Sequence, residues 1–253
     1  MRDVISACDV EALRALVDSR LRAGVDATGS AGTEKSPLVT QLLLASTRAA
    51  RVVRDLFLDQ RVQWVLGHFH CRPVIEHTKV LFKAAGAPET PWHQDQAFFQ
   101  AFDPSATMIT LWSPLHEVGP HNGALRVTRG DPPRRLLPHE RVNDEGELAV
   151  RPDVLAPLLA RGVDTPPVGP GDAILFSSRV VHGTHPNPSA QARLAFKLVF
   201  QDLERRFMEQ PLRDRAVVFH GVGGVINRLH PCALTRLRLQ PKLWKAQLRS
   251  RMH

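Results

Sequence analysis

The apolar positions in the first third of the chain recur at the spacing of amphipathic helices. In residues 9–24 they lie three and four positions apart, at Leu13, Leu16, Val17 and Leu21, and Gly24 follows them as a stop signal. Residues 40–67 carry apolar positions for one or two further helices. The pattern therefore predicts a helical N-terminal part, residues 1–73.

From about Val74 the pattern changes to short apolar runs. These runs have strand length, are rich in Val, Ile, Phe, Trp and Thr, and are separated by Pro, Gly and Asn; they read VIEHTKVLFK, WHQDQAFFQAF, ATMITLWSPLHEV, NGALRVT, DAILFSSRVVH and RLAFKLVFQDL. This spacing is typical of a sandwich or jelly roll and not of βαβ units. We therefore expect a mainly β fold with flanking helices (α+β) and a jelly-roll core over residues 74–203.

Residues 131–168 interrupt this series of strands. The segment is rich in proline and charge, and it contains one short helical piece, PDVLAPLLARG. An insertion of this length in a β domain is often functional, commonly as a lid over a site. We expect all 253 residues to form a single domain that ends in a basic tail, residues 204–253.

The composition is that of an ordinary soluble globular protein, with 43% hydrophobic and 23% charged residues. The N-terminus lacks the apolar core of a signal peptide, and no run approaches the roughly 18 apolar residues of a membrane span. We therefore expect a cytoplasmic protein that does not contact a membrane. Three cysteines, Cys8, Cys71 and Cys232, lie far apart and form no CxxC pair, which argues against a disulfide framework and against a zinc–thiolate site.

The net charge of +8 belongs to the C-terminal tail, because eight basic residues and no acid follow Asp214. Such a tail could contact nucleic acid, an acidic membrane surface or an anionic substrate. The solvated face of a packing helix is the favoured interpretation, and no RNA-binding aromatic motif or zinc-finger spacing supports a nucleic-acid partner.

The stretch PWHQDQAFF places His93 and Asp95 two residues apart in an aromatic-rich run. On a strand, such residues face the same way with Cα atoms roughly 6.5 Å apart, so an imidazole and a carboxylate can converge on one ion. Two histidines and one carboxylate form the non-heme Fe(II) arrangement, which leaves coordination positions open. For the second histidine we favour His182, at the end of a predicted strand, over His185, in the turn HPNP.

Arg193 begins the next predicted strand, and a hairpin would bring its guanidinium close to His182. An arginine beside a metal offers a bidentate clamp for a carboxylate. Taken singly, each of these residues is more often structural: His93 and Asp95 could be a surface pair on an edge strand. A buried aspartate without a cation or donors is costly, however, and the ordered set favours a metal site.

This ordered set resembles the phytanoyl-CoA dioxygenase-like branch of the Fe(II)- and 2-oxoglutarate-dependent oxygenases, from about Glu76 to Phe200. The resemblance rests on HTKVLFK, WHQD, a tryptophan followed by HNGAL, GDAILF, and HGTHPNPSAQAR, in which an arginine stands eleven residues after the histidine. It implies a double-stranded β-helix (jelly-roll, cupin-like) core. It also implies roles for seven residues: catalytic Fe(II) ligands at His93, Asp95 and His182, and 2-oxoglutarate contacts at Arg193, Thr184, Lys79 and Trp112.

The activity implied by the resemblance is O2-dependent oxidation of a small molecule, with release of succinate and CO2. We expect hydroxylation, with desaturation, ring closure or epimerisation as alternatives, on a natural product or an amino-acid-like compound. His185 stands where the family often has glycine, so it could compete as a ligand or face the substrate. His116, His121 and His139 lie in polar loops and are expected to face solvent.

Two alternatives to this activity come from other classes. A cupin-like metal-dependent hydrolase or isomerase would use the same ligands without oxygen. A nucleic-acid-associated module would use the basic tail. The oligomeric state is open.

Overall fold

The computed structural model describes residues 1–22, 47–69, 73–99, 108–143 and 147–202. Within these described ranges, three helices precede the strands: α1 (Ala7–Arg22), α3 (Thr47–Leu58) and α4 (Gln60–Phe69). They agree with the helical spacing of the sequence in the described part of that region. The predicted basic tail lies outside the described residues.

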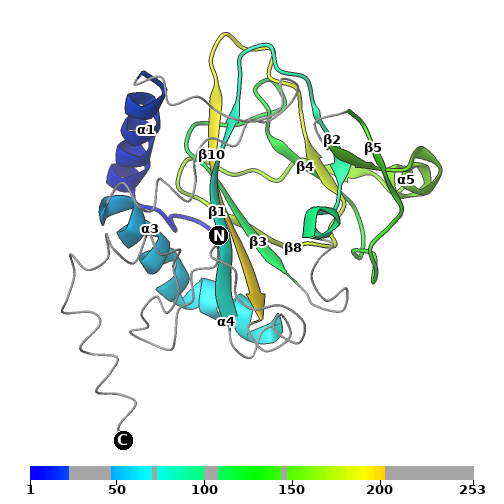
Figure 1. Ribbon diagram of the computed structural model, residues 1–253, viewed down its shortest axis with the longest axis horizontal. Helices are drawn as coiled ribbons and strands as arrows, with labels where there is room; N and C mark the ends of the chain where they lie inside the picture. The colour runs from blue at the N-terminus through cyan, green and yellow to red at the C-terminus, as the bar shows by residue number, and fades with distance from the viewer. Residues whose placement is uncertain (23–46, 70–72, 100–107, 144–146, 203–253) are drawn as a thin grey trace, which may run out of the picture.

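Two four-stranded antiparallel sheets form the body of the molecule (Figure 1). The first has the order β1 (Pro73–Lys83), β10 (Arg193–Asp202), β3 (Ile109–Pro114), β8 (Ile174–Ser177). The second has the order β2 (Thr90–His93), β9 (His182–Thr184), β4 (Leu125–Thr128), β7 (Val163–Asp164). Successive strands from β1 to β4 alternate between the two sheets, and so do successive strands from β7 to β10. Strands β4 and β7 lie in the same sheet, the second one. The fold is a jelly roll, as predicted.

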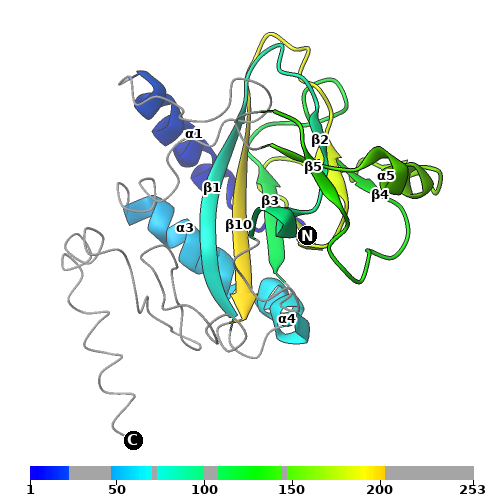
Figure 2. The same cartoon turned by 45° about the vertical axis from the view of Figure 1, so that its right-hand side comes forward.

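The first sheet is buried on both faces, because helices cover one face and the second sheet covers the other. Even-numbered residues of β10, such as Leu198 and Phe200, pack with Leu56 and Leu66 of the helices. Ala195, one position out of phase, packs instead in a cluster with Trp112, Leu125 and Phe176. Because side chains alternate between the two faces of a strand, one face of β10 packs against the helices and the other faces the second sheet, where functional side chains can lie. In Figure 2, α3 runs behind β1 and β10, and α4 lies next to the lower ends of β10 and β3.

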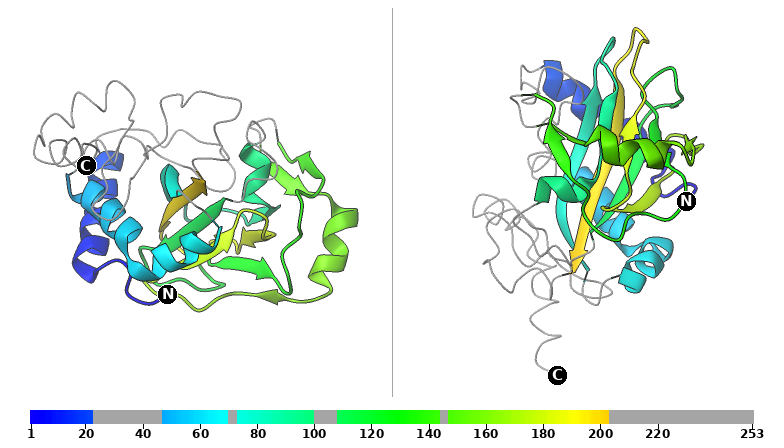
Figure 3. Two further views of the ribbon diagram at one scale, coloured as in Figure 1. Left: turned by 90° about the horizontal axis from the view of Figure 1, so that it is seen from below. Right: turned by 90° about the vertical axis from the view of Figure 1, so that its right-hand side faces the viewer.

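The inserted segment forms the β5 (His139–Arg141) and β6 (Leu148–Val150) hairpin and helix α5 (Pro152–Leu159). The predicted helical piece is confirmed, with proline at its first position, where no amide donor is needed. Val150 and Leu158 pack against Trp92 of β2 and Val181. The views in Figure 3 place α5 on the side of the molecule away from α1 and α3.

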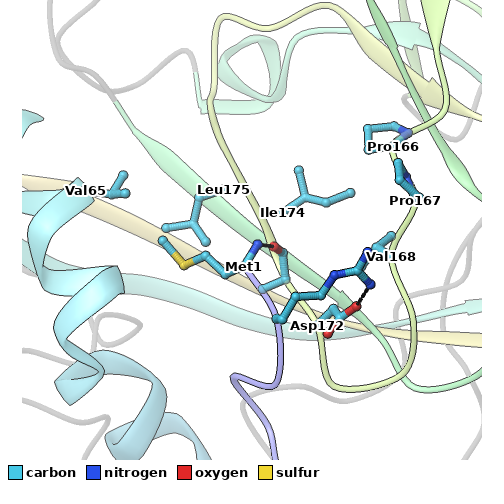
Figure 4. A pocket seen from close by; sticks show the side chains of 10 residues that line it. Met1, Val65, Pro166, Pro167, Val168, Asp172, Ile174 and Leu175 are labelled. Carbon is cyan, nitrogen blue, oxygen red and sulfur yellow. Dashed lines mark hydrogen bonds and ion pairs between the residues drawn. The ribbon is translucent and has the colours of Figure 1, made fainter.

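The first residues of the chain lie against residues 171–173, just before β8, on the outer side of the first sheet. The Met1 amine donates to the Ala173 carbonyl at 2.7 Å, and the Val4 and Ile5 amides donate to the Gly171 carbonyl at 2.9 Å. A groove of about 360 Å³ lies beside this segment, bordered by Val65, Pro166 and Leu175 among others (Figure 4). None of the predicted site residues lines it. Among the described residues, no helix is long and apolar enough to cross a bilayer.

Candidate active site

His93, Asp95 and His182 converge between the two sheets. His93 is the last residue of β2 and pairs in register with His182, the first residue of β9. Asp95 Oδ1 lies 3.7 Å from His93 Nε2 and 3.8 Å from His182 Nε2, and the three side chains each offer a ligand atom within 4.8 Å of the others. Cross-strand pairing therefore joins two histidines that are far apart in the sequence.

The route by which Asp95 reaches this cluster differs from the prediction. His93 and Asp95 do not lie on one strand, because β2 ends at His93 and Asp95 begins the 3-10 helix η1 (Asp95–Phe99). The backbone N–H of Gln94 donates to His139 Nε2 at 3.1 Å instead of to a neighbouring strand. The backbone N–H of Ala97 donates to the backbone carbonyl of Gln94 at 3.0 Å, which closes a turn. A turn, and not the strand pleat, points the carboxylate at the histidines.

Both imidazoles are oriented by backbone carbonyls. His93 Nδ1 lies 2.8 Å from the Pro91 carbonyl oxygen, and His182 Nδ1 lies 3.0 Å from the Val180 carbonyl oxygen. Since a carbonyl oxygen can only accept, each Nδ1 carries the hydrogen and each Nε2 is left as the ligand atom. Burial, reinforced by the His93 ring, lowers the pKa of His182 to about 3, so His182 is neutral near pH 7, as metal ligation requires.

The Asp95 carboxylate is almost fully buried, at 1% exposure. Its Oδ2 accepts from the Thr110 hydroxyl at 2.6 Å, and its Oδ1 accepts from the Lys197 ammonium at 2.6 Å. Burial raises the pKa of this carboxyl, but the charge of Lys197, together with the interactions with His182 and His93, outweighs it and holds the pKa well below its usual value. Asp95 is therefore ionised, which is again the form that binds metal.

These three side chains fit a divalent transition-metal ion. Two neutral imidazole nitrogens and one carboxylate oxygen converge, each held by a further hydrogen bond, and such N/O sets suit iron in oxygenases. Within the residues that the structure describes, this is the one group of three or more His, Cys, Asp or Glu side chains close enough to hold an ion. His185 is not part of it: its Nε2 lies 2.8 Å from the Thr165 hydroxyl of the inserted segment.

A cationic cradle, made of Arg193, Lys83 and Thr184, lies next to this cluster. Lys83 and Arg193 pair directly across β1 and β10, and both are buried, at 0% and 1% exposure. The Lys83 ammonium donates to the Thr184 hydroxyl at 3.1 Å, and the Arg193 guanidinium lies 5.6 Å from the centre of the Trp112 ring. Adjacent guanidinium, ammonium and hydroxyl groups are donors that bind a carboxylate.

The turn that contains Gly123 brings the backbone against this cradle. Gly123 has a φ of +86°, and a Cβ at this position would lie 2.6 Å from Lys83 Cδ and 3.5 Å from Arg193 Nε. The Asn122 side chain closes the turn by accepting from the Gly119 amide at 2.7 Å. Only glycine gives the long cationic side chains room to pass.

Lys83 belongs to this candidate site, and sequence reasoning did not single it out. Lys79, which was predicted to contact 2-oxoglutarate, pairs in register with Lys197, but its side chain is not among those described, so its role stays a prediction. Lys79 and Lys83 are four residues apart on one strand and therefore share a face. The four-residue spacing of Lys79 and Lys83 could be read from the sequence. The pairing of Lys83 with Arg193 across two strands could not.

The inserted segment is bound directly to the ligand-bearing turn through Gln94. This side chain is fully buried; its amide nitrogen donates to the Arg179 carbonyl at 2.7 Å and its oxygen accepts from the Leu137 amide at 2.7 Å. The expectation that His139 faces solvent is wrong, since His139 is half-buried and accepts the Gln94 amide. His116 is also half-buried and accepts from the Leu194 amide at 3.2 Å, whereas His121 is exposed.

Two facing antiparallel sheets with a His–Asp–His cluster between them place the chain among jelly-roll proteins with a candidate metal centre. The family model described as phytanoyl-CoA dioxygenase (PhyH) matches residues 1–195. The chain belongs to the phytanoyl-CoA dioxygenase family.

Relatives of this chain include one curated protein, 2-aminoethylphosphonate dioxygenase from the uncultured bacterium HF130_AEPn_1. It is 29% identical over 133 residues, which are 51% of this chain and 46% of the relative. The matched region thus spans about half the length of that protein.

Solved structures with the same fold include SnoN, EctD and EvdO2. The epimerase SnoN from nogalamycin biosynthesis is 23% identical with a TM-score of 0.60, over 89% of this chain and 91% of that one. EctD from S. alaskensis, with 2-oxoglutarate and 5-hydroxyectoine, is 22% identical with a TM-score of 0.59, over 92% and 80%. EvdO2 from Micromonospora carbonacea var. aurantiaca, complexed with 2-oxoglutarate, is 24% identical with a TM-score of 0.55, over 84% and 89%.

Proposed function

We propose that this chain is a non-heme Fe(II)- and 2-oxoglutarate-dependent dioxygenase that oxidises a small molecule. The observation that carries the proposal is the position of the His93–Asp95–His182 cluster beside the buried cradle of Arg193, Lys83 and Thr184. The first group would hold Fe(II). The second would hold the distal carboxylate of 2-oxoglutarate.

Bound Fe(II), with 2-oxoglutarate and O2, supplies the oxidising chemistry, and succinate and CO2 are the co-products. The protein holds the reacting groups in place. Carbonyl contacts at Nδ1 keep each imidazole Nε2 directed inward, and the Thr110 hydroxyl holds Asp95 Oδ2. The Trp112 ring forms a wall beneath the Arg193 guanidinium and keeps water from that side of the cradle.

The substrate belongs to natural-product or amino-acid-type metabolism in this proposal, and hydroxylation is the expected outcome. The relatives support this range: one is named for an aminophosphonate, one is bound to 5-hydroxyectoine, and one is an epimerase of nogalamycin biosynthesis. Since SnoN is an epimerase, epimerisation is the main alternative outcome. A cytoplasmic location, a single domain over residues 1–253 and the lack of a nucleic-acid partner are parts of the same proposal.

An anaerobic titration of the metal-free protein tests this function. Fe(II) is added first and 2-oxoglutarate second, while the weak visible charge-transfer band of the chelate is followed. We expect a band that saturates at one equivalent of each, and Arg193→Ala should require at least about tenfold more 2-oxoglutarate because a charge-assisted hydrogen bond is lost. Bound metal without a band would contradict the proposal and favour an oxygen-independent metal-dependent hydrolase or isomerase.

A further inference from the structure

Each of the three predicted metal ligands follows a residue that the inserted segment, residues 131–168, contacts. These residues are Trp92 before His93, Gln94 before Asp95, and Val181 before His182. Trp92 and Val181 share an apolar cluster with Val150 and Leu158 of the segment, and Gln94 Oε1 accepts from the Leu137 N–H. The segment thus packs behind all three ligands, although none of its described side chains belongs to the metal cluster.

His139 makes the contact on which the position of Asp95 depends. Strand β2 ends at His93, and the next backbone N–H, that of Gln94, donates to His139 Nε2 at 3.1 Å. Asp95 can therefore begin the 3-10 helix η1, where its carboxylate meets the Thr110 hydroxyl and both imidazoles. The turn that carries this ligand thus relies on an acceptor that the inserted segment supplies.

The His139 ring is held in the tautomer that this contact needs. Its Nδ1 lies 2.8 Å from the Leu137 carbonyl oxygen, which can only accept, so Nδ1 carries the hydrogen and Nε2 accepts the Gln94 N–H. Burial lowers the pKa of His139, so the ring is neutral near pH 7. Leu137 also donates its own N–H to Gln94 Oε1 at 2.7 Å. The segment therefore binds both the backbone and the side chain of Gln94.

Gln94 extends this support to the second histidine. Its side-chain nitrogen donates to the Arg179 carbonyl at 2.7 Å, and the next carbonyl along the chain, that of Val180, lies 3.0 Å from His182 Nδ1. Gln94 is fully buried, so a lost partner would leave a polar group without a hydrogen bond. A change in the inserted segment is therefore expected to affect both Asp95 and His182.

We infer that the inserted segment acts as the support of the metal site, in place of the lid that its length suggested, and that His139 is a positioning residue for Asp95. This inference rests on the proposed function, which assigns the cluster to a metal. In this role His139 touches neither metal nor substrate: it fixes the backbone at Gln94, and the backbone directs the carboxylate. Partners one bond removed from the ligands commonly change metal affinity by about 10- to 100-fold.

The test compares two isosteric replacements of the His139 ring in the full chain. His139→Gln places an amide oxygen near the position of Nε2, where it can still accept the Gln94 N–H. His139→Asn places its amide near the position of Nδ1, so it keeps the contact with the Leu137 carbonyl and loses the acceptor. Anaerobic calorimetric titration with Fe(II) alone measures metal affinity, and the visible spectrum of the Co(II)-loaded protein reports the number and geometry of the ligands. Neither measurement needs 2-oxoglutarate, O2 or a known substrate.

We expect His139→Gln to keep most of the wild-type affinity for Fe(II), and His139→Asn to bind Fe(II) about tenfold or more weakly and to alter the Co(II) spectrum. His116→Leu is the matched control. His116 is also half-buried and also accepts a backbone N–H, that of Leu194 at 3.2 Å, but it lies outside the inserted segment. This control should lose stability in urea to a comparable extent and keep the metal affinity of the wild-type protein.

The outcomes separate this inference from the proposed function. No metal binding in the wild-type protein contradicts both. Wild-type affinity in both His139 variants contradicts the inference alone, and so does equal weakening in the two, because the acceptor would then not matter. Weaker metal binding in His116→Leu would mean that any loss of stability loosens the cluster, which also counts against His139. If His139→Asn does not fold, Leu158→Ala, which loosens the apolar cluster around Trp92, carries the same expectation, and wild-type affinity in that variant contradicts the support by the inserted segment.

Discussion

Gly123→Ala should weaken 2-oxoglutarate binding, although Gly123 has no side chain that could contact the cosubstrate. The new methyl group would stand 2.6 Å from Lys83 Cδ, in the middle of a side chain that is fully buried. The lysine therefore has to shift, and its ammonium would lose the Thr184 hydroxyl at 3.1 Å and its place opposite Arg193. A change in the turn is thus expected to act through the cradle.

The size of the effect has two parts. Alanine at a positive φ costs about 1–2 kcal/mol, which lowers the free energy of unfolding. Loss of one charge-assisted hydrogen bond to the cosubstrate costs about 1.5–3 kcal/mol, which corresponds to a rise of about 10- to 100-fold in the Kd of 2-oxoglutarate. Only the loss of 2-oxoglutarate affinity depends on the cradle; the backbone cost of a positive φ does not.

Gly86→Ala separates these two parts. Gly86 also has a positive φ, +71°, but nothing lies within 4 Å of its Cβ position. Urea denaturation should therefore show a similar backbone cost in both variants, while calorimetric titration of the Fe(II)-loaded protein should show weaker 2-oxoglutarate binding in Gly123→Ala alone. Wild-type affinity in Gly123→Ala, or an equal loss in Gly86→Ala, would refute the reasoning. Lys83→Met should reproduce the loss, and adding Gly123→Ala to it should cost little more affinity.

Three further experiments test the metal cluster. His93→Ala and Asp95→Ala should each abolish substrate-dependent succinate formation while circular dichroism shows a retained fold, and turnover in both would contradict the assignment of the ligands. Thr110→Val removes the hydroxyl that donates to Asp95 Oδ2; we expect metal affinity to fall by about tenfold or more in a metal titration, and unchanged affinity would show that the hydroxyl does not support the ligand. In the metal-free protein, the pKa of His182 is lowered from 6.5 to about 3, so between these values the unfolded chain binds a proton that the native state does not. Stability should therefore fall as pH falls through this window, by at most about 5 kcal/mol, and His182→Phe should show a shallower dependence of the urea midpoint on pH; equal slopes would rule out His182 as the source.

Much of the fold was readable because its signals are local. The spacing of Leu13, Leu16 and Val17 identified α1, and short apolar runs between turn residues identified the strands. The exception was Asp95, which was expected on the strand of His93. A strand ends where its backbone N–H groups no longer donate to a neighbouring strand. The backbone N–H of Gln94 donates instead to His139, a residue of the inserted segment 45 positions away. No local pattern records such a pairing.

The parts of the site that escaped prediction are those that depend on strand register. Alternation along β10 already puts Arg193 and Lys197 on one face, so a second cation near the metal could have been expected from the sequence of that strand alone. The pairing of Lys83 with Arg193 could not, because a shift of one residue between β1 and β10 would turn every side chain of β1 to the opposite face. Since the outer face of this sheet must meet the apolar helices and cannot accept a buried ammonium, the hydrophobic residues Val80 and Leu198 set the register. The structural core of the protein therefore determines where the proposed cosubstrate cradle lies.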